Sequence, residues 1–149
     1  MLGRALVAFL VLPGTVAFLI PVLLLPSGIR GQSVYIPGLI PVVLGTVLLL
    51  WCVREFYVAG RGTLAPWAPP QKLIVTGLYR YSRNPIYIAV GLILCGWALA
   101  FRSRTLTVYA LVVMVAFHLR VVFDEEPWLA QTHGEQWVQY KARVPRWLF

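Results

Sequence analysis

Long uncharged stretches constrain the fold of this chain more than any other feature. Four apolar runs stand out, at residues 5–25, 34–53, 86–101 and 106–123, and only His118 and Arg120 interrupt the last one. A helix needs about 20 predominantly apolar residues to cross a bilayer. The sequence therefore predicts an all-α integral membrane protein of about four transmembrane helices.

Composition agrees with this interpretation. The chain has 149 residues, of which 60% are hydrophobic and 12% charged, whereas soluble domains carry about 25% charged residues. The first run follows Arg4 and could be a signal peptide, but it exceeds the usual apolar core of about 7–15 residues and no small-x-small cleavage site follows it. We expect it to be a retained helix.

Basic residues predict the orientation. The net charge is +8, from 13 Lys and Arg against 5 Asp and Glu, and we assign it to anionic lipid headgroups rather than to nucleic acid, because these residues lie between apolar runs. With both termini on one side, nine basic residues fall there: Arg4, Arg54, Arg61, Lys72, Arg80, Arg83, Lys141, Arg143 and Arg146. The other side has three, Arg30, Arg102 and Arg104. The positive-inside rule then places both termini in the cytoplasm of a bacterial-type inner membrane.

The connections between the runs complete the predicted topology. Residues 26–33 and 102–105 are short links, so each neighbouring pair of helices forms an antiparallel hairpin. Two longer polar stretches, 55–84 and 124–149, then meet at the cytoplasmic face, where function is expected. No metal site is predicted, because His118, His133, Cys52 and Cys95 lack the spacing of metal ligands.

The first polar stretch contains a predicted helix start. Asn84 suits the N-cap and Pro85 the first helical position. The free N–H groups there would attract an anion, and Lys72, Arg80 and Arg83 would strengthen that attraction. The alternative is that these cations only anchor the protein to headgroups.

The second polar stretch opens with Asp124, Glu125 and Glu126, three of the five acidic residues. They form either a solvated helix end or a counter-charge for a cationic ligand. The aromatic residues after them fit interfacial anchors: Trp128, Trp137, Tyr140 and Trp147. A cationic and an anionic site on one face would suit a zwitterion such as S-adenosylmethionine.

Four motifs fall in the last 90 residues or so. They are Leu73-Ile-Val-Thr-Gly-Leu-Tyr-Arg-Tyr-Ser-Arg-Asn-Pro-Ile-Tyr87, Glu125-Glu126-Pro-Trp-Leu129, His133-Gly-Glu-Gln-Trp-Val-Gln-Tyr140 and Val144-Pro-Arg-Trp-Leu148. In combination they resemble the isoprenylcysteine carboxyl methyltransferase and phospholipid methyltransferase superfamily. The resemblance begins near Gly60. It implies a transmembrane hairpin at residues 1–59 and a methyltransferase core at 60–149, made of a cytoplasmic cofactor-binding loop, a second hairpin and a C-terminal interfacial helix.

The resemblance also implies an activity and a site. Its members transfer a methyl group from S-adenosylmethionine at the cytosolic face to a lipophilic acceptor, such as an isoprenylcysteine-like carboxylate or a phospholipid amine. Ten positions would bind the cofactor: Gln71, Lys72, Leu73, Ile74, Tyr79, Asn84, Pro85, Ile86, Tyr87 and Glu125. Glu126 and Arg120 are the candidate catalytic residues. Asn84 replaces the histidine of the isoprenylcysteine enzymes, and Arg120 is displaced by one residue from the acceptor-side arginine.

Two other classes of protein remain compatible with the sequence. One is a non-catalytic membrane subunit that keeps the scaffold, and the other is a nicotinamide-dependent lipid reductase related to the sterol reductases. Affinities for the two cofactors would separate these classes. The acceptor group is open among carboxylate, amine and thiol.

Overall fold

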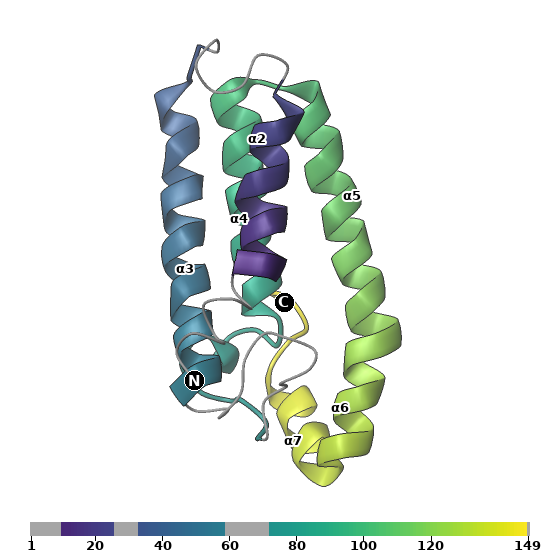
Figure 1. The fold of residues 1–149 in the computed structure, drawn as a ribbon. Coiled ribbons are helices and arrows are strands. Elements are labelled where there is room, and N and C mark those ends of the chain that lie inside the picture. Colours follow the sequence, from purple (N-terminus) through teal and green to yellow (C-terminus); the bar gives the residue numbers. More distant parts are fainter. Residues whose placement is uncertain (1–9, 26–32, 59–71, 149) are drawn as a thin grey trace.

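A computed structural model describes residues 10–25, 33–58 and 72–148 (Figure 1). Its elements are η1 (Leu10–Leu19, a π-type helix), α2 (Ile20–Leu24), η3 (Ile36–Gly38), α3 (Leu39–Val58), η4 (Gly77–Arg80), α4 (Pro85–Phe101), α5 (Arg104–Arg120), η5 (Val121–Glu125), α6 (Glu126–His133) and α7 (Glu135–Arg143). These residues contain helices and no strand, as the sequence predicted.

Two continuous helices are long and apolar enough to cross a bilayer. They run over Ile36–Val58 and Arg104–His133, with 23 and 30 residues. Only 22% and 17% of their most apolar windows are buried, whereas the core helix of a soluble protein would be mostly covered. Large side chains such as Val47 and Leu111 are exposed, which suits contact with lipid. Two of the four predicted runs appear as shorter apolar helices, Val11–Leu24 and Pro85–Phe101.

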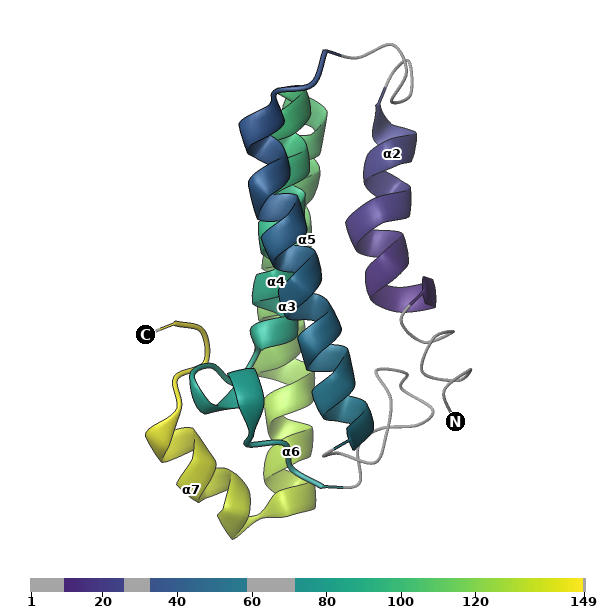
Figure 2. The same cartoon turned by 90° about the vertical axis from the view of Figure 1, so that its left-hand side faces the viewer.

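The long helices form a layer. Helix α4 lies between α3 and α5 (Figure 1), and the η1–α2 segment stands against one face of that layer when the molecule is turned (Figure 2). One buried cluster joins Ala17 of η1, Leu49 of α3, Ile93 of α4 and Ala110 of α5. The packing thus unites residues from both sides of the predicted division at residue 59.

Glycines bring α3 and α4 into backbone contact. A Cβ atom added at Gly96 would lie 2.7 Å from the Val42 nitrogen and 2.9 Å from the Gly38 oxygen. One added at Gly45 would lie 2.7 Å from the Ala89 oxygen. Helices inside lipid gain attraction from such close approach, since no hydrophobic effect drives them together there.

The last apolar helix is longer than the sequence predicted. The predicted run ends at residue 123, yet the helix continues through Asp124, Glu125 and Glu126 to His133. The three carboxylates therefore do not lie at a helix end, so the prediction of a solvated helix end is wrong. Residues 121–126 contain neither glycine nor proline to break the helix, and both glutamates are paired with arginines. A π-turn, η5, widens the helix just ahead of Pro127.

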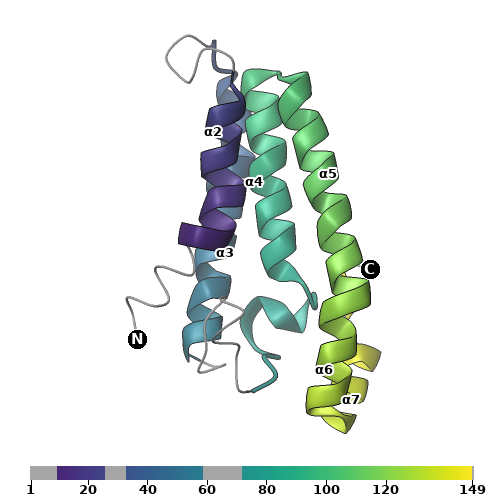
Figure 3. The ribbon, with the colours of Figure 1, turned by 45° about the vertical axis from the view of Figure 1, so that its right-hand side comes forward.

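The described parts of the two polar stretches lie at the same end of the layer. Residues 72–84 pass between the end of α3 and α6 (Figure 3), and α7 folds back beneath part of them (Figure 2). The backbone N–H of Arg83 donates to the Pro145 oxygen at 2.9 Å. This contact joins segments 62 residues apart.

Candidate active site

A pocket of about 540 Å³ opens at this end of the molecule, within the range typical of small-molecule sites. Nine of the predicted site residues line it: Lys72, Leu73, Ile74, Tyr79, Asn84, Ile86, Tyr87, Arg120 and Glu125. Pro85 and Glu126 are buried but do not belong to the lining. Gln71 falls outside the described residues. A motif spread over about 50 residues thus converges on one cavity.

The wall of this pocket has two chemical characters. Its apolar part comes largely from the helices, with Leu12, Pro13, Val16, Val90 and Phe117. Its polar part comes from the 72–84 segment and from residues 120–125, with Lys72, Arg83, Asn84, Arg120, Asp124 and Glu125. A ligand that fills the pocket would meet opposite charges and a hydrocarbon surface together.

The π-turn brings Arg120 and Glu125 together. Arg120 Nε donates to Glu125 Oε1 at 3.0 Å, although the two residues are five positions apart in the sequence. In a regular α-helix, residues five apart would point about 140° from each other, whereas a π-turn closes at that spacing. The extra residue of a π-turn offers a physical account of the one-residue displacement of Arg120. The Tyr87 hydroxyl bonds to the same oxygen of Glu125.

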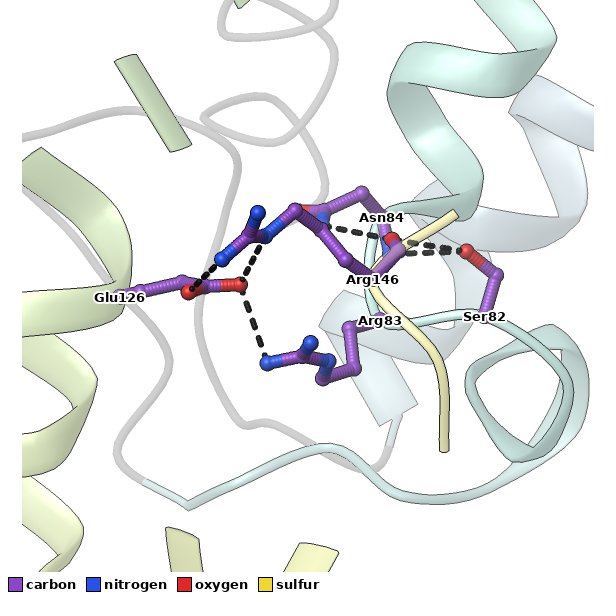
Figure 4. A network of polar contacts seen from close by, with 5 residues as sticks. All are labelled: Ser82, Arg83, Asn84, Glu126 and Arg146. Carbon is purple, nitrogen blue, oxygen red and sulfur yellow. Dashed lines mark hydrogen bonds and ion pairs between the residues drawn. The ribbon is translucent and has the colours of Figure 1, made fainter. Parts of the chain in front are cut away.

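Glu126 lies in a separate, buried ion-pair cluster (Figure 4). Arg146 donates from Nε to Oε1 and from Nη2 to Oε2 of Glu126, both at 2.9 Å. Arg83 approaches from the pocket side, with Nη1 3.0 Å from Oε1. The side chains of Arg83 and Glu126 are only 8% and 11% exposed. Both oxygens of Glu126 are therefore engaged by arginines.

The C-terminal segment fastens the chain ahead of α4. Asn84 Nδ2 donates to the Arg146 carbonyl at 2.9 Å, and the Ser82 hydroxyl donates to the same oxygen at 3.3 Å (Figure 4). Asn84 does occupy the N-cap of α4, with Pro85 at its start, but its side chain makes no capping hydrogen bond. The amide is used instead to hold the C-terminal segment.

Two buried tyrosines fix the loop that carries the predicted cofactor residues. The Tyr140 hydroxyl donates to the Tyr79 carbonyl at 2.8 Å. Burial raises the pKa of Tyr79 and of Tyr140, although the charge of Arg83 opposes the rise at Tyr140. Both hydroxyls are therefore neutral at physiological pH.

Glu55 holds the same loop from the end of α3. The Thr76 hydroxyl donates to Glu55 Oε2 at 2.8 Å. Gly77 follows with φ of +58°, and a Cβ there would lie 2.8 Å from Glu55 Cδ. Only glycine adopts this left-handed conformation without strain and leaves room for the carboxylate.

Some pocket residues were not predicted. Trp137 and Tyr140 were interpreted as interfacial anchors, but they are only 3% and 8% exposed and line the pocket, so that interpretation is corrected. They pack with Val144, and the spacing 137, 140, 144 is the helical signal that could have found them. Leu12 and Pro13 carry no such signal, since apolar residues that face lipid have the same composition as apolar residues that face a pocket. Among the described residues, no group of three or more potential metal ligands occurs.

Lipid-facing helices with a charged and apolar pocket at one end define a membrane protein with a candidate site for a small, amphipathic molecule. The chain belongs to the phospholipid methyltransferase family, whose family model matches residues 33–136. Membership implies a membrane methyltransferase that acts on lipids. The match confirms the resemblance to the superfamily and begins upstream of Gly60, so that it includes α3. No curated protein and no solved structure matches the chain.

Proposed function

We propose that the protein transfers a methyl group from S-adenosylmethionine to a lipophilic acceptor at the cytoplasmic face of the membrane. One observation carries this proposal beyond the family. A carboxylate, Glu125, and a buried guanidinium, Arg83, line the same pocket as an apolar helix wall. These are the partners that an ammonium, a carboxylate and a hydrocarbon chain require.

The donor fits the residues of the polar wall. Glu125 would accept hydrogen bonds from its ammonium or ribose, and Leu73, Ile74 and Ile86 offer apolar contact for the base. Lys72, Tyr79, Asn84 and Tyr87 complete the cofactor set, together with Pro85, which begins α4, and Gln71. When bound, S-adenosylmethionine supplies a methyl group already activated by a sulfonium. The protein's own task is to align the two reactants.

Three residues would prepare the site for transfer. Tyr87 and Arg120 hold the Glu125 carboxylate from two sides. Arg120 borders both the polar wall and the apolar helix α5, where it would meet the head of the acceptor. Glu126 is buried behind Arg83, so we assign it a positioning role. The acceptor is a lipid or lipid-modified molecule that arrives from the inner membrane, with a carboxylate or an amine as its reacting group.

A charge-removing substitution tests the donor site. In Glu125→Gln, shape is kept but a charged hydrogen bond worth about 1.5–3 kcal/mol is lost, so affinity for S-adenosylmethionine should fall roughly tenfold or more. Calorimetry on detergent-solubilised protein measures it. Glu135→Gln, an exposed change outside the pocket, is the matched control and should bind normally.

Two results would contradict the proposal. Unchanged donor affinity in Glu125→Gln would remove the carboxylate from the site. Tighter binding of a nicotinamide dinucleotide than of S-adenosylmethionine by the unmodified protein would instead favour a reductase. Transfer of a radiolabelled methyl group into extractable lipid supplies the direct evidence of activity.

A further inference from the structure

Arg83 is a buried cation whose donors are not all used. Its side chain is 8% exposed and lines the pocket. Its Nη1 lies 3.0 Å from Glu126 Oε1 as an ion pair, but neither Nε nor Nη1 makes a hydrogen bond with a described residue. A guanidinium has five N–H donors, and leaving such donors dry and unpaired is costly.

The cluster around Arg83 carries an excess positive charge. Arg83 and Arg146 contribute two positive charges and Glu126 one negative charge. Arg146 binds both oxygens of Glu126, so the carboxylate is committed mainly to Arg146. Arg83 is left with one shared oxygen and with the Trp137 ring, whose centroid is 5.4 Å from its Cζ.

A positive charge such as that of Arg83, only partly neutralised and facing a cavity, favours an anionic ligand. Burial lowers the pKa of Arg83, and the nearby Arg146 lowers it too, although the Glu126 carboxylate opposes the fall. A bound anion would add a second attraction that favours the charged guanidinium. Lys72 and Arg120 also line the pocket, but both are exposed, and Arg120 is paired with Glu125. Arg80 is exposed and does not belong to the lining. Arg83 is thus the desolvated cation of the pocket wall, where a charged hydrogen bond counts most.

We propose that Arg83 is an oxyanion-binding residue of the pocket and that it takes a carboxylate or phosphate oxygen of one of the reactants. The planar guanidinium matches two oxygens on one centre. Two reactants carry such a group: the amino-acid end of the donor and the head of a phospholipid acceptor. This inference rests on the proposed function, which supplies both molecules.

Pairs of ligands with and without the anionic group test the inference. The donor pair, which would occupy the donor site, is S-adenosylhomocysteine (the donor without its methyl group) and its decarboxylated analogue. The acceptor pair is a short-chain phosphatidylethanolamine and a phosphate-free alkyl amine of equal chain length. Affinities are measured by calorimetry for the unmodified protein, Arg83→Gln, Arg83→Lys and the control Arg80→Gln. The ratio within each pair does not depend on the fraction of folded protein.

The unmodified protein should prefer the anionic member of one pair by roughly tenfold to a hundredfold. Arg83→Gln should bind both members about equally, Arg83→Lys should keep part of the preference, and Arg80→Gln should keep all of it. A ratio lost in the donor pair identifies the carboxylate as the ligand, and one lost in the acceptor pair identifies the phosphate.

Two outcomes would overturn the inference, and they differ from each other. If Arg83→Gln keeps both ratios while weakening every ligand equally, Arg83 only supports the fold, and the proposed function stands. If the unmodified protein binds neither member of the donor pair, the proposed function fails, and this inference fails with it.

Discussion

One oxygen of Glu125 serves two partners, the Tyr87 hydroxyl and Arg120 Nε. A cationic donor that binds Glu125 must compete with Arg120 for that carboxylate. In Arg120→Gln the competing charge is gone, so the affinity for S-adenosylmethionine should be unchanged or higher. Methyl transfer should nevertheless fall roughly tenfold or more, because a charged contact to the acceptor is lost.

This prediction separates binding from turnover. Calorimetry gives the donor affinity, and kcat/KM for the lipid acceptor gives the transfer. Arg104→Gln, which removes an exposed arginine at the opposite end of α5, should change neither. A parallel loss of donor affinity and transfer in Arg120→Gln would mean that Arg120 supports the donor site rather than the acceptor.

At the scale of elements, α3 and α4 pack closely because glycines at their contact have no side chain. Gly96→Ala would press a methyl group against the backbone of Val42 and Gly38. Overpacking of this kind costs about 1–3 kcal/mol, so the Tm in detergent should fall by several degrees. The neighbouring exposed residue provides the control: Cys95→Ala should leave the Tm nearly unchanged. Equal Tm values for both variants would show that the helices are farther apart.

The helices themselves were largely predictable from the sequence. Apolar runs located α3, α4 and α5, and Asn84 with Pro85 located the start of α4, since these signals are local. The π-turn was not predictable, because residues 121–125 have an ordinary helical composition. Its winding accompanies the pairing of Glu125 with Arg120 and with Tyr87 of another helix. A contact between distant segments produces no periodic pattern in the sequence of either segment.

The candidate site also has a part that was predictable from the sequence and a part that was not. Residues of one contiguous motif, such as Tyr79 and Tyr87, reach the pocket because the loop and the first turn of α4 carry them there. Leu12 joins them from a helix about 60 residues upstream. In a membrane protein, an apolar side chain that faces lipid and one that faces a pocket satisfy the same composition, so only packing distinguishes them.

The whole molecule places the 72–84 segment at one end and the 102–103 turn at the other (Figure 1). Basic residues predict that the first lies in the cytoplasm. In a variant without Cys52 and Cys95, Ser103→Cys should react with a membrane-impermeant thiol reagent on intact cells. Tyr81→Cys, at an exposed position, should react only after lysis. The opposite pattern would reverse the orientation and move the pocket to the outer face.

The apolar part of the pocket wall predicts how the rate depends on the acceptor's tail. Each CH₂ transferred from water to an apolar environment contributes about 0.8 kcal/mol, but a tail already in lipid gains little by moving between helices. Methylation should therefore rise with tail length in a homologous series and level off once the acceptor has partitioned fully. A short, water-soluble acceptor methylated as fast as its long-chain analogue would rule out entry from the bilayer.

The π-turn η5 lies between Arg120 and Glu126 within one continuous helix, and its one extra residue determines which way the rest of the helix faces. If residues 121–125 wound as an ordinary α-helix with none of them removed, everything downstream would rotate by about 100°, because a π-turn holds one residue more than an α-turn. Glu126 would then turn away from both of its arginines, and α7 would leave its place beneath the loop. The helix would keep its length and hydropathy almost unchanged, yet the two halves of the pocket would be out of phase.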